Sequence, residues 1–136
     1  MIEVELLGGS LAPEEPSEPE IGRLCELAAA SRGVREGHVA IEFVSTARIA
    51  ELNARHRGKA APTDVLSFPI DGAGPLAAGE DERQRELGDI VICPRHTSDL
   101  REAIVHGMLH LLGMDHETDA GEMLALQEEL LGEDDR

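Results

Sequence analysis

The sequence predicts a single α+β domain, residues 1–136, in which a four-stranded mixed sheet packs with helices. Three observations lead to this fold class. The chain length leaves room for one hydrophobic core and no second domain of ordinary size. Segments with strand-like and helix-like hydrophobic periodicity follow one another in the order βαβαββαα. Turn signals separate these segments, and neither repeats nor a low-complexity domain interrupt them.

The first half of the chain contains two predicted strands and two predicted helices. Residues 2–7 alternate apolar and acidic side chains, as in a strand with one buried face. Residues 20–31 carry apolar side chains at helical spacing, and residues 39–44 form the next strand. Ser45 or Thr46 then provides an N-cap for the second helix.

The two later strands, residues 64–70 and 87–92, are expected to be neighbours in the sheet. Residues 72–85 connect them with a glycine-rich, acidic loop that has almost nothing to bury beyond Leu76. We therefore predict that this loop is mobile and unnecessary for catalysis.

The last two predicted elements are helices. The first runs to Leu112 after an N-cap at Ser98 or Thr97, and the second covers residues 119–131. The first of these helices is rich in aliphatic side chains, so we expect it to be buried against the sheet.

Three of the six histidines fall within eleven residues, at His106, His110 and His116. His106 and His110 are one helical turn apart and share a face. Gly113 occupies the position where a helix end favours a left-handed residue, which lets the chain reverse and return His116 to that face. Three imidazoles leave the fourth tetrahedral position open to water, as in a catalytic zinc site. The pattern predicts a metal centre at the C-terminal end of a buried helix.

Two alternatives bear on this motif. Zinc peptidases share the histidine spacing, but Gly107 stands where they carry a general-base glutamate. Alternatively, the histidines are ordinary core residues without a metal. Unpaired imidazoles in an apolar helix would be costly to bury, which disfavours this second interpretation.

Further motifs extend over residues 35–131 in a fixed order. They are L-N-x-x-x-R ending at Arg57, PTDVLSFP at residues 62–69, LGDIVI at residues 87–92 and HGMLHLLGMDH at residues 106–116. Together they resemble the signatures of the YbeY-type endoribonucleases, the bacterial rRNA maturation factors, and the resemblance implies a zincin-like α+β fold. The chain departs from the family pattern in a short segment at residues 93–105 and in Met114, where an aromatic residue is common.

The resemblance implies a metal-dependent, single-strand-specific endoribonuclease that hydrolyses RNA with a zinc-activated water. Its expected role is rRNA maturation, including processing of the 16S 3′ end, and ribosome quality control, with the rRNA precursor and the ribosome as partners. One zinc ion per chain is expected on His106, His110 and His116, and nickel is an alternative acquired during purification. Arg57 is the expected catalytic and phosphate-binding residue, and Lys59 adds a second positive charge.

The overall charge argues against a binder of long nucleic acids. The chain has 12 basic and 28 acidic residues, a formal net charge of −16. The balance reverses in residues 46–70, where Arg48, Arg55, Arg57 and Lys59 gather. A small positive patch beside a metal suits a short single strand, although such residues also form ordinary solvated helix faces.

Two other function classes remain open from the sequence. One is a metallopeptidase-like hydrolase, and the other is a non-catalytic, ribosome-associated zinc protein in which Cys93 or Asp115 completes the metal coordination. Asp115 has two further interpretations: a partner that fixes a histidine tautomer, or a turn cap. The absence of a membrane-length apolar run, an acidic N-terminus and only two cysteines predict a cytoplasmic protein. We expect a monomer.

Overall fold

The computed structural model describes residues 1–135, and within that range it contains four strands and four α-helices. In chain order these are β1 (Ile2–Leu7), α1 (Glu18–Ser31), β2 (Gly37–Phe43), α2 (Thr46–Arg57), β3 (Val65–Pro69), β4 (Glu86–Ile92), α3 (Leu100–Leu111) and α4 (Glu122–Asp134). This order confirms the predicted βαβαββαα arrangement and the α+β fold class. No helix in the described range is long and apolar enough to cross a membrane.

The four strands form one mixed sheet in the order β1-β2-β4-β3. β1, β2 and β4 run parallel to one another, whereas β3 pairs antiparallel with β4 at one edge. The prediction that the two later strands are sheet neighbours is therefore confirmed. Because β3 is the edge strand, one of its sides is free to border a cleft.

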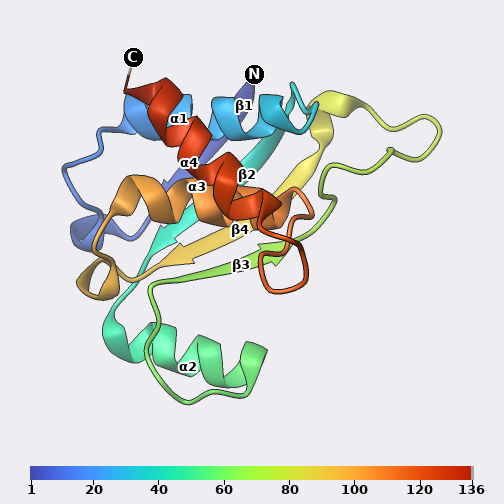
Figure 1. The fold of residues 1–136 in the computed structure, drawn as a ribbon. Helices are drawn as coiled ribbons and strands as arrows, with labels where there is room; N and C mark the ends of the chain where they lie inside the picture. The colour runs from blue at the N-terminus through green and yellow to red at the C-terminus, as the bar shows by residue number, and fades with distance from the viewer. Residues whose placement is uncertain (136) are drawn as a thin grey trace.

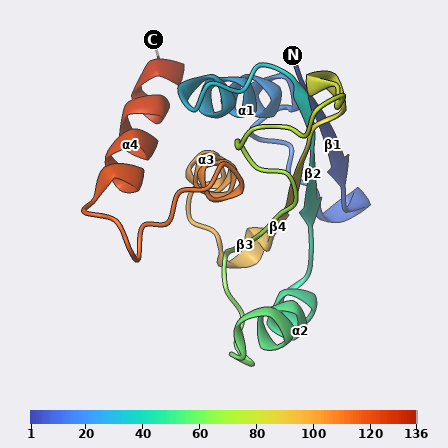
Figure 2. The same ribbon diagram turned by 90° about the vertical axis from the view of Figure 1, so that its right-hand side faces the viewer.

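Helices α1, α3 and α4 lie on one side of the sheet, with α3 between the sheet and α4 (Figures 1 and 2). Their apolar side chains form one buried cluster with alternate residues of the strands, including Ile90 and Ile92. The intervening Val91 faces the other way, into a smaller cluster with Ile49 and Leu66 that seats α2. β4 is thus buried on both faces near its C-terminal end, and α2 projects beyond the main body (Figure 2).

α3 approaches β4 closely at Gly107. A Cβ atom built at this position would lie 2.8 Å from Cγ2 of Ile90, which is fully buried. The Ser67 hydroxyl on β3 donates to the Gly107 carbonyl at 3.3 Å. The absence of a side chain at Gly107 therefore sets how near the histidine helix lies to the sheet.

The predicted N-cap of α3 is wrong: neither Ser98 nor Thr97 occupies that position. Asp99 is the N-cap, and its carboxylate accepts backbone N–H groups of the first helical turn at 3.0 and 3.3 Å. The Thr97 hydroxyl instead donates to the Cys93 carbonyl at 2.8 Å. A carboxylate also complements the positive end of the helix dipole, which a hydroxyl does not.

Two other helix starts differ from the predicted ones. α1 begins at Glu18, earlier than its hydrophobic pattern indicates, because the Ser17 hydroxyl caps it. α4 begins at Glu122, later than predicted. The Asp119 carboxylate, placed inside the predicted helix, instead accepts the Met123 N–H at 2.9 Å from the preceding turn.

The loop between β3 and β4 has a buried anchor that sequence patterns did not reveal. Arg85 is only 8% exposed, and its guanidinium donates to the carbonyls of Gly72 and Gly74 at 2.6 and 3.0 Å. Ala73 packs against the main cluster. The prediction that this loop buries almost nothing beyond Leu76 is therefore wrong at both ends of the loop.

Candidate metal centre and cleft

The histidine positions follow from how α3 ends. Gly113 has a φ of 97°, the left-handed region expected for it. Its N–H donates to the His110 carbonyl at 3.0 Å, and the Met114 N–H donates to the Leu109 carbonyl at 3.0 Å. These two bonds form a Schellman motif, which turns the chain back along the helix. His116 is thereby returned to the helix face that carries the other two histidines.

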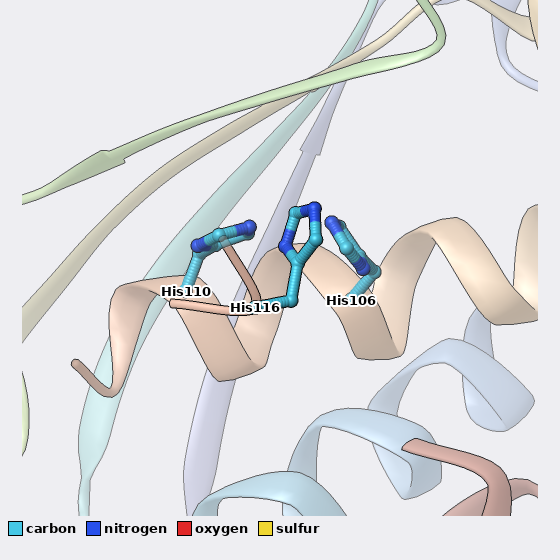
Figure 3. A group of neighbouring side chains, drawn as sticks. All are labelled: His106, His110 and His116. Carbon is cyan, nitrogen blue, oxygen red and sulfur yellow. The ribbon is translucent and has the colours of Figure 1, made fainter. Parts of the chain in front are cut away.

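The three imidazole rings converge beside α3 (Figure 3). Their centroids are separated by 4.7 Å for His106 and His110, 4.9 Å for His106 and His116, and 5.2 Å for His110 and His116. One potential ligand atom from each ring lies within 4.8 Å of the others. Three nitrogen donors gathered in this way match the ligand set of a zinc-type site.

The environments of His110 and His116 also fit a metal ion. Burial, and then the proximity of His106 and His116, lowers the pKa of His110, which favours the neutral ring that a metal requires. Nδ1 of His116 is buried without a hydrogen-bond partner among residues 1–135. A desolvated, unpaired ring nitrogen is unfavourable in the free protein, and this one lies among the three histidines.

No fourth side chain completes the ligand set in the described part of the chain, where the group consists of the three histidines. Cys93 is buried in the smaller cluster that seats α2, with its Sγ 3.8 Å from the Thr46 hydroxyl. The Asp115 carboxylate accepts the Glu117 N–H at 2.9 Å. Asp115 therefore acts as the turn cap that the sequence left open as one alternative.

The histidines line a cleft of about 520 Å³. The end of α2 and the edge strand β3 form the other walls. Arg57 and His56 contribute from α2, Ser67 from β3, and Glu117 from the loop after α3. The cleft thus brings together residues such as Arg57 and Glu117, which lie 60 positions apart in the sequence.

Of the two basic residues expected to bind substrate, Arg57 lines this cleft. Its guanidinium pairs with Glu117 at 3.5 Å, and both side chains are substantially exposed. An exposed pair of this kind contributes roughly 0–1 kcal/mol to stability, so it holds the guanidinium only weakly. Lys59 lies just beyond the end of α2, is exposed, and is not among the residues that line the cleft.

Gly107 explains why this site departs from the zinc-peptidase pattern. The position follows His106 directly, where those peptidases carry a general-base glutamate. Here it faces the buried Ile90 instead of the cleft, and a side chain larger than hydrogen meets the sheet. The fold therefore has no room for a glutamate at this position.

Sequence reasoning missed two polar neighbours of the histidines. Glu117 lines the cleft beside Arg57. Gln127, on α4, is only 8% exposed and lies with its Oε1 2.9 Å from Nδ1 of His106. A signal for Gln127 was present, because it shares a buried helical stripe with Met123 and Leu130 and is the polar member of that stripe.

Fold and site together define an α+β domain with an open three-histidine group in a cleft, the arrangement of a metal-dependent hydrolase. The family model described as endoribonuclease YbeY matches residues 12–134. The chain belongs to this family, as its motifs predicted.

Curated relatives agree over most of the chain. An endoribonuclease YbeY from Rubrobacter xylanophilus is 41% identical over 130 residues, covering 91% of this chain and 86% of the relative. Another from Macrococcus caseolyticus is 34% identical over 151 residues, covering 96% and 94%. The fold is similar to the solution structure of TM1509 from Thermotoga maritima, with a TM-score of 0.55, 26% identity and coverage of 96% of this chain and 88% of that one.

Proposed function

We propose that the chain is a metal-dependent, single-strand-specific endoribonuclease that acts in rRNA maturation, including processing of the 16S 3′ end, and in ribosome quality control. The observation that carries the proposal is the cleft in which Arg57 and the three-histidine group lie together. Membership of the endoribonuclease YbeY family supports RNA as the substrate. The expected site of action is the cytoplasm, on the rRNA precursor and with the ribosome as partner.

His106, His110 and His116 would hold one zinc ion per chain, and nickel would bind the same ligands during purification. Bound zinc supplies a Lewis acid and lowers the pKa of a coordinated water. Burial, and then the proximity of His106 and His116, lowers the pKa of His110, which favours the neutral form of that ring. The protein also leaves the cleft side of the group free of protein ligands within residues 1–135.

Arg57 would bind the scissile phosphate. A planar guanidinium donates two parallel hydrogen bonds, which fix the phosphate and strengthen as charge develops on its oxygens. Arg57 must first exchange Glu117 for the phosphate, and the long 3.5 Å contact means that little stability is lost in this exchange. Lys59, outside the cleft, would contact a flanking phosphate rather than the scissile one.

The distribution of charge favours a short single strand. The outer face of the sheet carries exposed acidic residues such as Glu3 and Glu5, which repel a polyanion. The positive side chains next to the cleft come from α2, where Arg55 and Arg57 occupy the last turn. Because this basic region covers only one side of a small domain, a long duplex would gain few contacts.

The two other function classes have specific observations against them. A peptidase mechanism lacks its glutamate, because Gly107 packs against the sheet. A purely structural zinc site would have a fourth protein ligand, but among residues 1–135 no fourth side chain joins the three histidines: Cys93 lies in the cluster that seats α2, and Asp115 caps the turn after α3.

The test is a comparison of substrates with one purified protein. Labelled single-stranded RNA, the same RNA in a duplex, and casein are each incubated with the protein, with and without a chelator. We expect cleavage of the single strand alone, its loss with the chelator, and its return when zinc is added back. Cleavage of casein, or RNA cleavage that persists in the chelator, would contradict the proposal.

A further inference from the structure

Gln127 is a polar residue in an apolar position. Helix α4 packs against α3 and α1, and its Met123, Gln127 and Leu130, which recur at helical spacing, are all buried. A glutamine amide buried in such a stripe is unfavourable unless it is hydrogen-bonded. Its partner is His106, the first histidine of the three-histidine group.

The chemistry of this contact fixes the state of the ring. Oε1 of Gln127 lies 2.9 Å from Nδ1 of His106, and an amide oxygen can only accept a hydrogen bond. With this oxygen as the acceptor, Nδ1 is the donor, and the neutral ring then has its lone pair on Nε2. We propose that Gln127 is a positioning residue that holds His106 in the Nδ1–H tautomer and in one ring orientation, so that Nε2 is ready to bind the metal. This inference rests on the proposed metal dependence of the site.

The three histidines differ in this respect. His106 is the one whose ring is held by a side-chain hydrogen bond among residues 1–135. Nδ1 of His116 is buried and unpaired within that same range. A preorganised first ligand lowers the entropy lost when the metal binds, and partners of this kind typically contribute about 10–100-fold to metal affinity.

The contact depends on how α4 is docked. Asp134, near the end of α4, accepts hydrogen bonds from Arg101 on α3 and Arg23 on α1, each at 2.7 Å. These bonds and the apolar stripe fix α4 against the histidine helix. A test must therefore separate a direct effect of the Gln127 amide from a general loosening of α4.

Three variants make that separation. Gln127→Leu keeps the size and burial but removes the acceptor, Gln127→Glu restores an oxygen acceptor, and Leu130→Ala loosens α4 without touching a histidine. Zinc dissociation constants are measured by chelator competition, and the His106 tautomer is read from ¹⁵N chemical shifts of the metal-free protein. We expect Gln127→Leu to weaken zinc binding by about 10–100-fold and to give a mixture of tautomers, Gln127→Glu to retain both properties, and Leu130→Ala to change only thermal stability.

Three results would overturn the inference: unchanged zinc affinity in Gln127→Leu, an Nε2–H tautomer of His106 in the wild-type protein, or equal weakening by Leu130→Ala. The outcome is independent of RNA cleavage. If the protein binds zinc in a Gln127-dependent way but cleaves no RNA, the proposed function fails and the positioning role stands. If the protein cleaves RNA but its zinc affinity does not depend on Gln127, the positioning role fails and the proposed function stands.

Discussion

The face of α3 that borders the cleft and the face that packs on the sheet differ in what they contact. One face presents His106 and His110 to the cleft, where their rings meet His116. A neighbouring face presents Gly107 and Leu111 to the sheet, where Gly107 lies against Ile90 with no room for a Cβ atom. The first face is polar and borders His116, whose buried Nδ1 has no hydrogen-bond partner among residues 1–135, whereas the second face is close-packed.

This difference shows how one short helix serves both fold and chemistry. The close-packed face sets the distance between α3 and the sheet, and β3, the edge strand, forms the opposite wall of the cleft. Changes on the cleft face should therefore remove function and leave folding intact, whereas changes on the sheet face should affect folding first.

The largest expected effect is on the cleft face. His110→Ala removes one of three ligands, so we expect loss of bound zinc and of RNA cleavage with a folded protein remaining. Elemental analysis, a cleavage assay and circular dichroism measure the three properties. His96→Ala, an exposed histidine outside the cleft, is the matched control and should retain metal and activity. Full zinc content in His110→Ala would refute the ligand assignment.

Gly107→Glu tests the sheet face. The glutamate must either enter the core against Ile90 or push α3 away, and an uncompensated buried charge is destabilising by about 3–5 kcal/mol. We expect a large loss in the free energy of unfolding, measured with denaturant, and no gain of peptidase activity.

Gly132→Glu is the matched control for Gly107→Glu. Gly132 is exposed on α4, and a Cβ atom added there would meet no neighbouring atom of residues 1–135 within 4 Å, so this variant should be nearly neutral. Similar stability of the two variants would mean that the close contact at Gly107 has no energetic weight.

Substitutions of Arg57 test the wall of the cleft that the end of α2 forms. Arg57→Ala should lower the rate of RNA cleavage by about 10²–10³-fold, the usual effect of removing one donor to developing charge. Arg57→Lys should recover only part of that loss, because it restores the charge without the two parallel donors. Zinc content and stability should not change. Arg55→Ala, whose guanidinium pairs with Glu51 on the same helix, controls for loss of a nearby charge. If Arg57→Ala and the wild type cleave RNA at the same rate, Arg57 has no role in cleavage and forms only a surface ion pair with Glu117.

Arg85 tests the loop between β3 and β4. Arg85→Ala removes two hydrogen bonds from a buried guanidinium, so we expect a loss of about 1.5–3 kcal/mol in the free energy of unfolding. Replacing residues 75–81 by a short glycine-serine segment should have little effect on stability or cleavage. Arg83→Ala is the control, since Arg83 is exposed and pairs with Asp81 in the same loop. An unchanged free energy of unfolding in Arg85→Ala would show that this buried anchor has no energetic weight.

The smallest expected effect concerns Asp134. Burial would raise the pKa of this carboxyl, but hydrogen bonds from Arg23 and Arg101 outweigh it and lower the pKa below its ordinary value. Since the folded pKa lies below the unfolded one, this contribution is complete above about pH 4 and disappears as the pH falls through the folded value. Asp134→Asn should cost about 1 kcal/mol at pH 7 and less at a pH low enough to protonate Asp134 in the folded protein. A loss that is the same at both pH values would assign the effect to packing instead.

The sequence predicted what depends on local spacing. The one-turn separation of His106 and His110 and the reversal at Gly113 are properties of any α-helix with a glycine C-cap, so the histidine group followed from the sequence alone. The strand order at the β3–β4 edge followed from the succession of elements in the same way.

Contacts between distant elements were not predictable from spacing. Gln127 meets His106 across 21 positions only because α4 packs on α3, and the burial of Arg85 depends on the path of its own loop. The Asp99 cap was missed for a different reason, because Thr97, Ser98 and Asp99 are all good N-cap residues. The Thr97 hydroxyl donates to the Cys93 carbonyl in the preceding turn instead of capping the helix.

If the proposed function is correct, one metal ion on the three histidines is required for RNA hydrolysis. The most direct measurement is the initial rate of cleavage of a labelled single-stranded RNA as zinc is titrated into metal-free protein. We predict a rate that rises from zero and reaches its plateau at one zinc per chain, with no rise for His110→Ala. A metal-free protein that cleaves at the plateau rate, or a plateau that His110→Ala also reaches, would contradict this requirement.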